Sequence, residues 1–116
     1  MQYMLFLYSD EERFHRLPQE EQERIIGAHM AYTNKLEEAG ALMGGNPLAN
    51  PSEGKSIKAK SGGTTVEDGP FTDSKEQLGG YYLIEAENLD EAIDWASECP
   101  VAIDGTVEIR PVWKIS

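Results

Sequence analysis

The 116-residue chain contains one cysteine, Cys99, and only two histidines, His15 and His29. A single cysteine cannot form an internal disulfide, and it excludes zinc sites built from several thiolates. Because Cys99 lies between Glu98 and Pro100 without a basic neighbour, we interpret it as a buried or half-buried thiol rather than a nucleophile. The two histidines are too far apart in sequence to share a helical face, and no metal-ligand spacing occurs. We therefore expect neither a metal nor a cofactor.

Basic residues are also scarce: ten stand against 21 acidic ones, which gives a formal net charge of −11. Nucleic acids and anionic membrane surfaces attract basic patches, so this charge argues against both as partners. Lys55, Lys58 and Lys60 form the tightest basic group, which we interpret as the solvated face of a hairpin. The amino terminus lacks a basic leader and its apolar run is too short to span a membrane. The expected location is the cytoplasm.

That first apolar run, residues 3–8, alternates between two faces that are both apolar: Tyr3, Leu5 and Leu7 on one, Met4, Phe6 and Tyr8 on the other. A strand of this kind is covered on both sides of its sheet. A chain of this length fits one domain, residues 1–116, and has too little helix to cover both faces. A second subunit is therefore expected to cover one of them.

The rest of the pattern predicts the order β-α-β, an inserted hairpin, then β-α-β. Helices are predicted over residues 18–40 and from Asn88 to before Pro100, and strands over residues 41–45, 55–60, 64–67, 79–86 and 106–113. Asp73 with Glu76, or Ser74 with Gln77, predicts a capped helical turn, and Phe71 is expected to anchor the hairpin to the body. Two β-α-β units give a ferredoxin-like α+β fold with an antiparallel sheet and both helices on one face.

The turn after the hairpin, Asp68-Gly69-Pro70-Phe71, resembles the signature of the DGPF proteins, a branch of the YCII-related family. The resemblance extends over most of the chain, through the apolar first strand, Ala28-His29-Met30-Ala31-Tyr32, Gly44-Gly45, Leu89-Asp90-Glu91-Ala92 and residues 107–112. It implies a dimeric α+β barrel, in which two ferredoxin-like sheets pack face to face. It also implies a histidine–aspartate pair, which maps onto His29 and Asp68, although Gly69 intervenes before Pro70 and Phe71. One degradative branch of the family dehydrochlorinates chlorinated hydroxyhydroquinones.

His29 is the leading catalytic candidate on physical grounds too. It lies on one helical stripe with Ile25, Tyr32, Leu36 and Ala39, where its ring nitrogens need partners. An aspartate partner such as Asp68 would fix the tautomer and make a general base near neutral pH. The alternatives are a core histidine bonded to a backbone carbonyl, and an Asp68 that serves the turn alone. His15 is interpreted as an exposed surface residue.

Three further residues are candidates for substrate binding: Tyr32, Tyr81 and Arg110. Tyrosines, including Tyr82 beside Tyr81, can line a small apolar pocket with their polar tips. Arg110 could hold an anionic substrate by paired hydrogen bonds. The alternatives are core or interface tyrosines, and an ion pair between Arg110 and Glu108 or another acidic residue across the sheet.

Two functional classes follow. The first is a small cofactorless enzyme that uses His29 and Asp68 for proton transfer, in an elimination or isomerisation of a small organic substrate. The second is a non-catalytic homodimer that binds a small molecule or regulates a partner. The family resemblance suggests a link to sigma-factor-dependent transcription for this second class, because its genes are frequent neighbours of such factors. A dimer whose turns are only structural is a third possibility.

Overall fold

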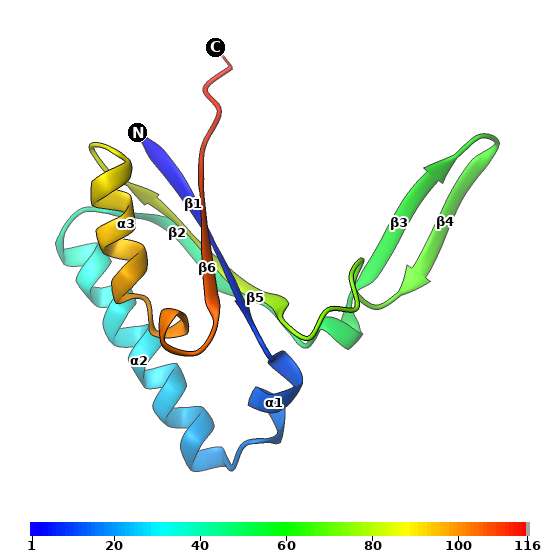
Figure 1. Cartoon of the computed structure of the whole chain (residues 1–116), viewed down its shortest axis with the longest axis horizontal. Helices are drawn as coiled ribbons and strands as arrows, with labels where there is room; N and C mark the ends of the chain where they lie inside the picture. Colours follow the sequence, from blue (N-terminus) through cyan, green and yellow to red (C-terminus); the bar gives the residue numbers. More distant parts are fainter. Residues whose placement is uncertain (116) are drawn as a thin grey trace.

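The computed structural model describes residues 1–115. Four strands form the main antiparallel sheet in the order β2-β5-β1-β6: β1 (Gln2–Ser9), β2 (Leu42–Pro47), β5 (Gln77–Glu85) and β6 (Thr106–Pro111). Two long helices, α2 (Gln19–Glu38) and α3 (Leu89–Glu98), lie along one face of this sheet (Figure 1). This is the ferredoxin-like α+β arrangement that the sequence predicts.

Three short helical segments connect these elements: α1 (Glu11–Arg16) and the 3-10 turns η1 (Pro51–Glu53) and η2 (Pro100–Ile103). Helix α1 was not predicted, because six residues are too few to show a helical period. Its first turn is capped by the Asp10 carboxylate, which accepts from Arg13 N at 3.0 Å. The predicted cap of α3 is confirmed, since Asn88 Oδ1 accepts from Glu91 N at 2.9 Å.

The predicted hairpin is a separate two-stranded sheet, β3 (Lys55–Lys60) paired with β4 (Gly63–Asp68). It projects away from the body on the side of the sheet opposite to α2 and α3 (Figure 1). We call residues 55–68 the arm. The expectation that Phe71 anchors the arm to the body is wrong, because Phe71 is 77% exposed and lies against Lys58, 5.5 Å from ring centroid to Nζ.

The helical turn predicted near residue 74 is also wrong. The side chains there bond to backbone carbonyls: Ser74 Oγ donates to Glu76 O at 2.7 Å, and Gln77 Nε2 donates to Ser74 O at 2.6 Å. Such local bonds offer the backbone an alternative to a helix. The segment consists of bends that lead directly into β5.

The core lies between the sheet and the two helices. Its largest fully buried side chains are Leu5, Leu36, Ile84 and Cys99. Only Tyr32 and Leu36, both in the carboxyl-terminal half of α2, are buried on that helix. The amino-terminal half of α2 therefore stands off the sheet and leaves space beneath it.

Candidate functional site

A cleft of about 580 Å³ occupies the space beneath the amino-terminal half of α2. Its walls come from α1, α2 and the strands β1, β2 and β5, and are mostly apolar. The apolar lining includes Leu7, Phe14, Ile25, Ile26, Met30, Leu42, Leu48 and Val101, and the polar lining includes Ser9, Glu11, His15, His29, Thr33, Asn34 and Tyr82. An apolar cavity of this size with a few polar groups is typical of a small-molecule site.

His29 lies in this cleft, bonded to a side chain from the sheet. Its Nδ1 lies 3.0 Å from the Tyr82 hydroxyl, which reaches up from β5. Within residues 1–115 this is the one protein hydrogen bond of the ring, so the second ring nitrogen, Nε2, has no protein partner. Every buried side-chain nitrogen or oxygen in that range does have a partner. Nε2 is therefore not buried, and it is accessible to solvent and to a ligand.

Burial lowers the pKa of His29 below its usual value. Removing the imidazole from water disfavours its charged form, and no carboxylate offsets this effect. His29 is thus neutral at pH 7, the state in which one ring nitrogen has a lone pair. A neutral, accessible imidazole in an apolar cleft can accept a proton from a bound molecule.

Thr33, one turn along α2, completes a small network with His29 and Tyr82. Its hydroxyl donates to the His29 backbone oxygen at 2.9 Å, and its Oγ1 lies 3.5 Å from the Tyr82 hydroxyl. Tyr82 can therefore donate to His29 Nδ1, or accept from Nδ1–H while donating to Thr33. The first arrangement places N–H at Nε2; the second leaves a lone pair there.

Tyr82 is held firmly because its ring packs in the core. It is 8% exposed and meets the ring of Tyr32 edge-on, with centroids 5.2 Å apart. Gly45 on the neighbouring strand permits this packing, since a Cβ there would lie 3.0 Å from the Tyr82 ring. Burial raises the pKa of Tyr82, so its hydroxyl stays protonated at neutral pH.

A second polar group, Glu11 of α1, borders the cleft. Ser9 Oγ donates to Glu11 Oε2 at 2.7 Å, and the carboxylate lies directly over Gly79 of β5. A Cβ at position 79 would lie 2.5 Å from the carboxylate, so only glycine leaves room for it there. Sequence reasoning missed Glu11, because nothing in the pattern shows that Gly79 would face it.

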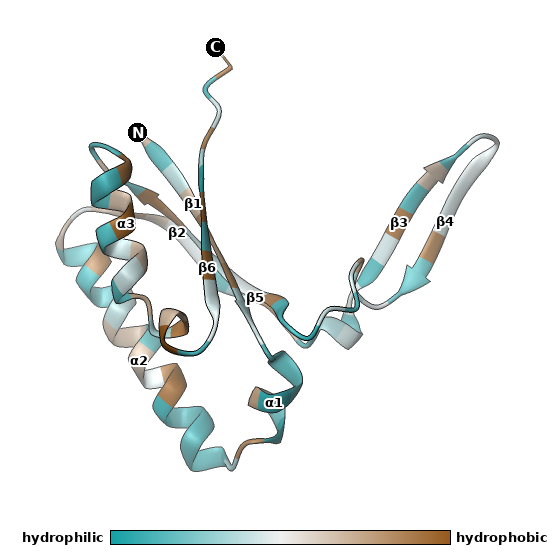
Figure 2. Ribbon diagram, viewed as in Figure 1, coloured by the Kyte–Doolittle hydropathy of each residue, from teal (hydrophilic) through white to brown (hydrophobic). Residues whose placement is uncertain are grey.

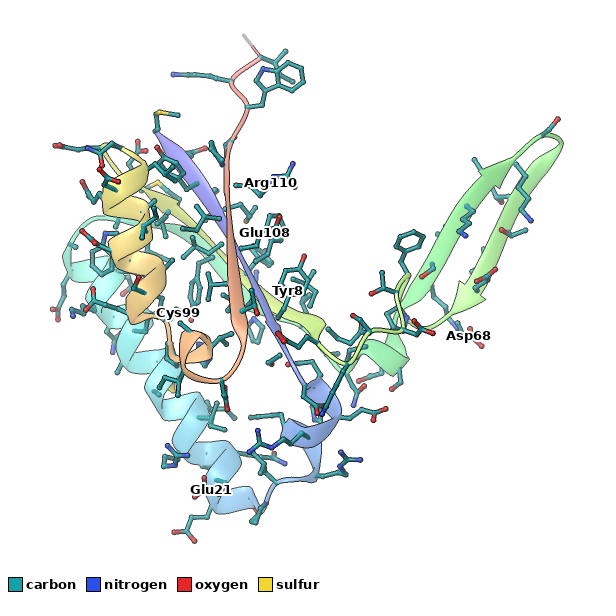
Figure 3. All side chains as sticks on the ribbon, viewed as in Figure 1. Tyr8, Glu21, Asp68, Cys99, Glu108 and Arg110 are labelled. Carbon is teal, nitrogen blue, oxygen red and sulfur yellow. The ribbon has the colours of Figure 1, made fainter. Side chains whose placement is uncertain are left out.

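Asp68 and His29 are not brought together within one chain. Asp68 lies at the base of the arm, where it forms an ion pair with Lys55, and its side chain is 86% exposed (Figure 3). Helix α2, which carries His29, lies on the other side of the sheet (Figure 1). The partner that the sequence assigns to His29 is thus replaced, within the chain, by Tyr82.

The predicted substrate-binding residues lie apart as well. Tyr32 is in the core, where its hydroxyl donates to Trp95 O at 2.7 Å. Tyr81 borders the cleft, but its side chain alternates to the opposite face of the sheet, where Asn46 Nδ2 donates to its hydroxyl at 3.0 Å. Arg110 is on that opposite face too, 3.8 Å from Glu108, the ion pair that the sequence left open (Figure 3).

Among residues 1–115, no group of three or more His, Cys, Asp or Glu side chains could hold a metal ion. None of the helices in that range has the length and apolar character needed to cross a membrane. His15 is exposed at the cleft, as expected of a surface residue. Cys99 is buried, and burial raises the pKa of its thiol.

Comparison with known proteins identifies relatives of the whole chain. The family model of the YCII-related domain matches residues 1–116. An uncharacterised protein of Rhizobium meliloti (strain 1021), R00369, is 37% identical over 114 residues, which are 97% of this chain and 92% of the relative. A similar solved structure is that of 5-chloro-2-hydroxyhydroquinone dehydrochlorinase (TftG) from Burkholderia phenoliruptrix AC1100, in complex with 2,5-dihydroxybenzoquinone. It has a TM-score of 0.52 at 22% identity over 98% of this chain and 94% of that chain, a likeness of fold.

Proposed function

The chain belongs to the YCII-related domain family, and from that premise we propose that it is a small cofactorless enzyme in which His29 transfers a proton in the cleft. The reaction class is elimination or isomerisation of a small organic substrate. The observation that carries the proposal is the bond of 3.0 Å between His29 Nδ1 and the Tyr82 hydroxyl. It orients an imidazole that burial keeps neutral, with Nε2 accessible from an apolar cavity.

In the proposed reaction, Nε2 takes a proton from a hydroxyl or an activated carbon of the substrate. The electron pair that this releases moves through the substrate and expels a leaving group, or reprotonation at another atom completes an isomerisation. Tyr82 accepts from Nδ1–H and disperses the charge that forms on the imidazole. The apolar walls lower the local dielectric around a bound substrate, which strengthens these polar contacts.

The other predicted site residues could act on the substrate only from a second subunit or through a neighbouring side chain. Asp68 could pair with His29 only if its carboxylate came from another copy of the chain or if the arm moved, since its partner within the chain is Lys55. Tyr81 and Arg110 share the sheet face opposite to the cleft, so a ligand that they bind would lie between subunits. Tyr32 acts through Tyr82, whose ring it supports.

A homodimer is part of the same proposal. We define the open face of the sheet as Met4, Phe6, Tyr8, Tyr81, Leu83 and Arg110, which point away from α2 and α3. Its apolar members are only half-buried in the single chain. Packing two such faces together would give a dimeric α+β barrel, and the turn Asp68-Gly69-Pro70-Phe71 supports the DGPF branch within the family.

A second candidate function is a dimer that binds a small molecule without catalysis, or that regulates a partner. The regulatory form would be linked to sigma-factor-dependent transcription. The second candidate is favoured by one observation, namely that no carboxylate bonds to the His29 ring within residues 1–115. A cleft of this kind can hold a ligand by apolar contact and by hydrogen bonds to Tyr82 and Thr33 alone. The two candidates differ in what His29 does to the ligand.

The structural neighbour supplies probes for both. 5-Chloro-2-hydroxyhydroquinone would be incubated anaerobically with the protein, with chloride release measured, and binding of 2,5-dihydroxybenzoquinone would be followed by calorimetry. The enzyme proposal expects release by the native protein and by His15→Gln, and a loss of roughly 100-fold or more in His29→Gln. Turnover that survives His29→Gln contradicts it. Binding by the native protein with no chloride release, unchanged in His29→Gln, supports the second candidate.

A further inference from the structure

Among the described residues 1–115, the arm is a hairpin of two strands to which no third strand is added. In that range its strands pair only with each other, and its two ends are joined by Gly69 N, which donates to Gly54 O at 2.8 Å. An isolated two-stranded hairpin is marginally stable in water and needs a further strand or a packed face to be ordered. The arm therefore lacks, within one chain, the contacts that would fix it.

One face of the arm is apolar and exposed. Ile57 and Val66 are directly opposite in the register, and they are 68% and 61% exposed. Figure 2 shows the corresponding apolar bands on both β3 and β4. A paired apolar face of this kind gains free energy once another surface covers it.

The arm and the open face of the sheet lie on the same side of the molecule. Figure 1 shows them diverging from a common base, with α2 and α3 on the far side of the sheet. Tyr8, Glu108 and Arg110 point from the sheet toward the arm (Figure 3). A body placed against the open face would therefore also lie beside the arm.

The charge distribution indicates that the molecule bound against the open face is a second copy of this chain. The arm carries Lys55, Lys58 and Lys60 against Glu67 and Asp68, a net charge of +1, whereas the chain outside the arm has seven basic and 19 acidic residues, a net charge of −12. A basic arm on an acidic body is complementary to another acidic body, and a two-fold dimer makes each contact twice. Lysines on a strand edge also discourage open-ended strand pairing, which favours a closed dimer over a fibre.

The area of the interface also supports a dimer in which the arms take part. The open face, four strands wide and six residues long, has a footprint of about 400 Å². A stable interface buries about 800 Å² per partner, roughly twice that footprint. Each subunit would add its own arm and the surface beneath its partner's arm, about 200 Å² for each, which reaches the usual size.

We propose that the β3–β4 arm is a clasp that holds a second copy of the chain, with Ile57 and Val66 buried against the partner's body. The inference rests on the proposed homodimer and adds to it a specific surface. The sheet faces give the dimer its centre, and the two arms give it the additional area and charge complementarity. In the dimer the arm is ordered by the partner.

Sedimentation equilibrium of the full chain tests the clasp. The double variant Ile57→Ser/Val66→Ser changes side chains that are exposed in the single chain, so folding, checked by circular dichroism, is expected to be unaffected. Because four apolar side chains leave the interface of each dimer, its dissociation constant is expected to rise roughly 100-fold or more. Thr65→Ser, on the opposite face of the arm, is the matched control and should behave as the native chain.

The outcomes separate the clasp from the dimer. If the native chain is a dimer and the double variant dimerises equally well, the clasp is wrong and the dimer stands. If the native chain is a monomer throughout, both proposals are wrong. Hydrogen exchange gives an independent reading: amides of β3 and β4 should become protected as the protein concentration rises, and equal exchange in monomer and dimer overturns the clasp.

Discussion

His29 Nδ1 and the hydroxyl of Tyr82 lie 3.0 Å apart, across the boundary between a helix and the sheet that it covers. The two residues are 53 positions apart in sequence, so the fold alone brings them together. The contact lies where the packed core meets the apolar cleft. The core fixes Tyr82, and the cleft leaves His29 Nε2 accessible. It gives His29 a defined orientation without a carboxylate.

The depressed pKa of His29 predicts a pH dependence of stability. In the unfolded chain His29 has a pKa of about 6.5, and in the folded chain burial lowers it. Between the two values the unfolded state binds more protons, so the free energy of unfolding rises with pH through that window. The stabilisation is complete above about pH 6.5 and is lost as the pH falls through the window. Urea unfolding at a series of pH values measures it.

His29→Gln should flatten that profile over the same pH window, because the group whose pKa differs between the folded and unfolded chain is removed. A native profile in which the free energy of unfolding falls as the pH rises toward about pH 6.5 would contradict the assigned direction.

Gly79→Ala should destabilise the protein and displace Glu11. The new Cβ would lie 2.5 Å from the Glu11 carboxylate, which must leave its bond with Ser9. Because the group that must move is the end of a flexible, half-exposed side chain, the cost is mainly that of the lost hydrogen bond, about 0.5–1.5 kcal/mol. Gly44→Ala is the control, since a Cβ there meets nothing within 4 Å. Urea midpoints that are equal for the two variants would show that Glu11 is not held over Gly79.

Leu36→Ala tests where the core lies along α2. Leu36 is fully buried, so its truncation should lower the free energy of unfolding by about 2–5 kcal/mol. Met30, on the same helix, is 63% exposed at the cleft, and Met30→Ala should change stability by less than about 0.5 kcal/mol. Comparable losses in chemical denaturation would mean that the amino-terminal half of α2 packs as tightly as the other half.

Cys99 should be inert in the folded protein. It is 1% exposed, and burial raises the pKa of its thiol, so the reactive thiolate is scarce. Ellman's reagent is expected to label it slowly in buffer and rapidly in denaturing urea. Fast labelling under native conditions would show that the helix end carrying Cys99 opens readily.

The sheet could be predicted from the sequence because its signals are local. Tyr3, Leu5 and Leu7 alternate with a second apolar set, and the structure buries the first set while leaving the second half-buried. Asn88 caps its helix through a neighbour three residues away. Each of these features is visible within one short window of the chain.

The site could be predicted only in part, because its contacts are long-range. The helical stripe predicts that His29 faces the sheet, and it does. It does not show which residue of β5 meets the ring, since Tyr81 and Tyr82 point to opposite faces and a shift of one residue exchanges them. The direction of the arm, which takes Asp68 away from His29, likewise has no local signal.

Nitrogen-15 NMR of the His29 ring across pH tests the central claim most directly. The account predicts a pKa for His29 below its usual value of about 6.5, and a neutral form with the proton at Nδ1 and a lone pair at Nε2. In Tyr82→Phe the partner of Nδ1 is lost, and the proton should move to Nε2. A His29 with a pKa at or above about 6.5, and with a tautomer that Tyr82→Phe leaves unchanged, would contradict the account.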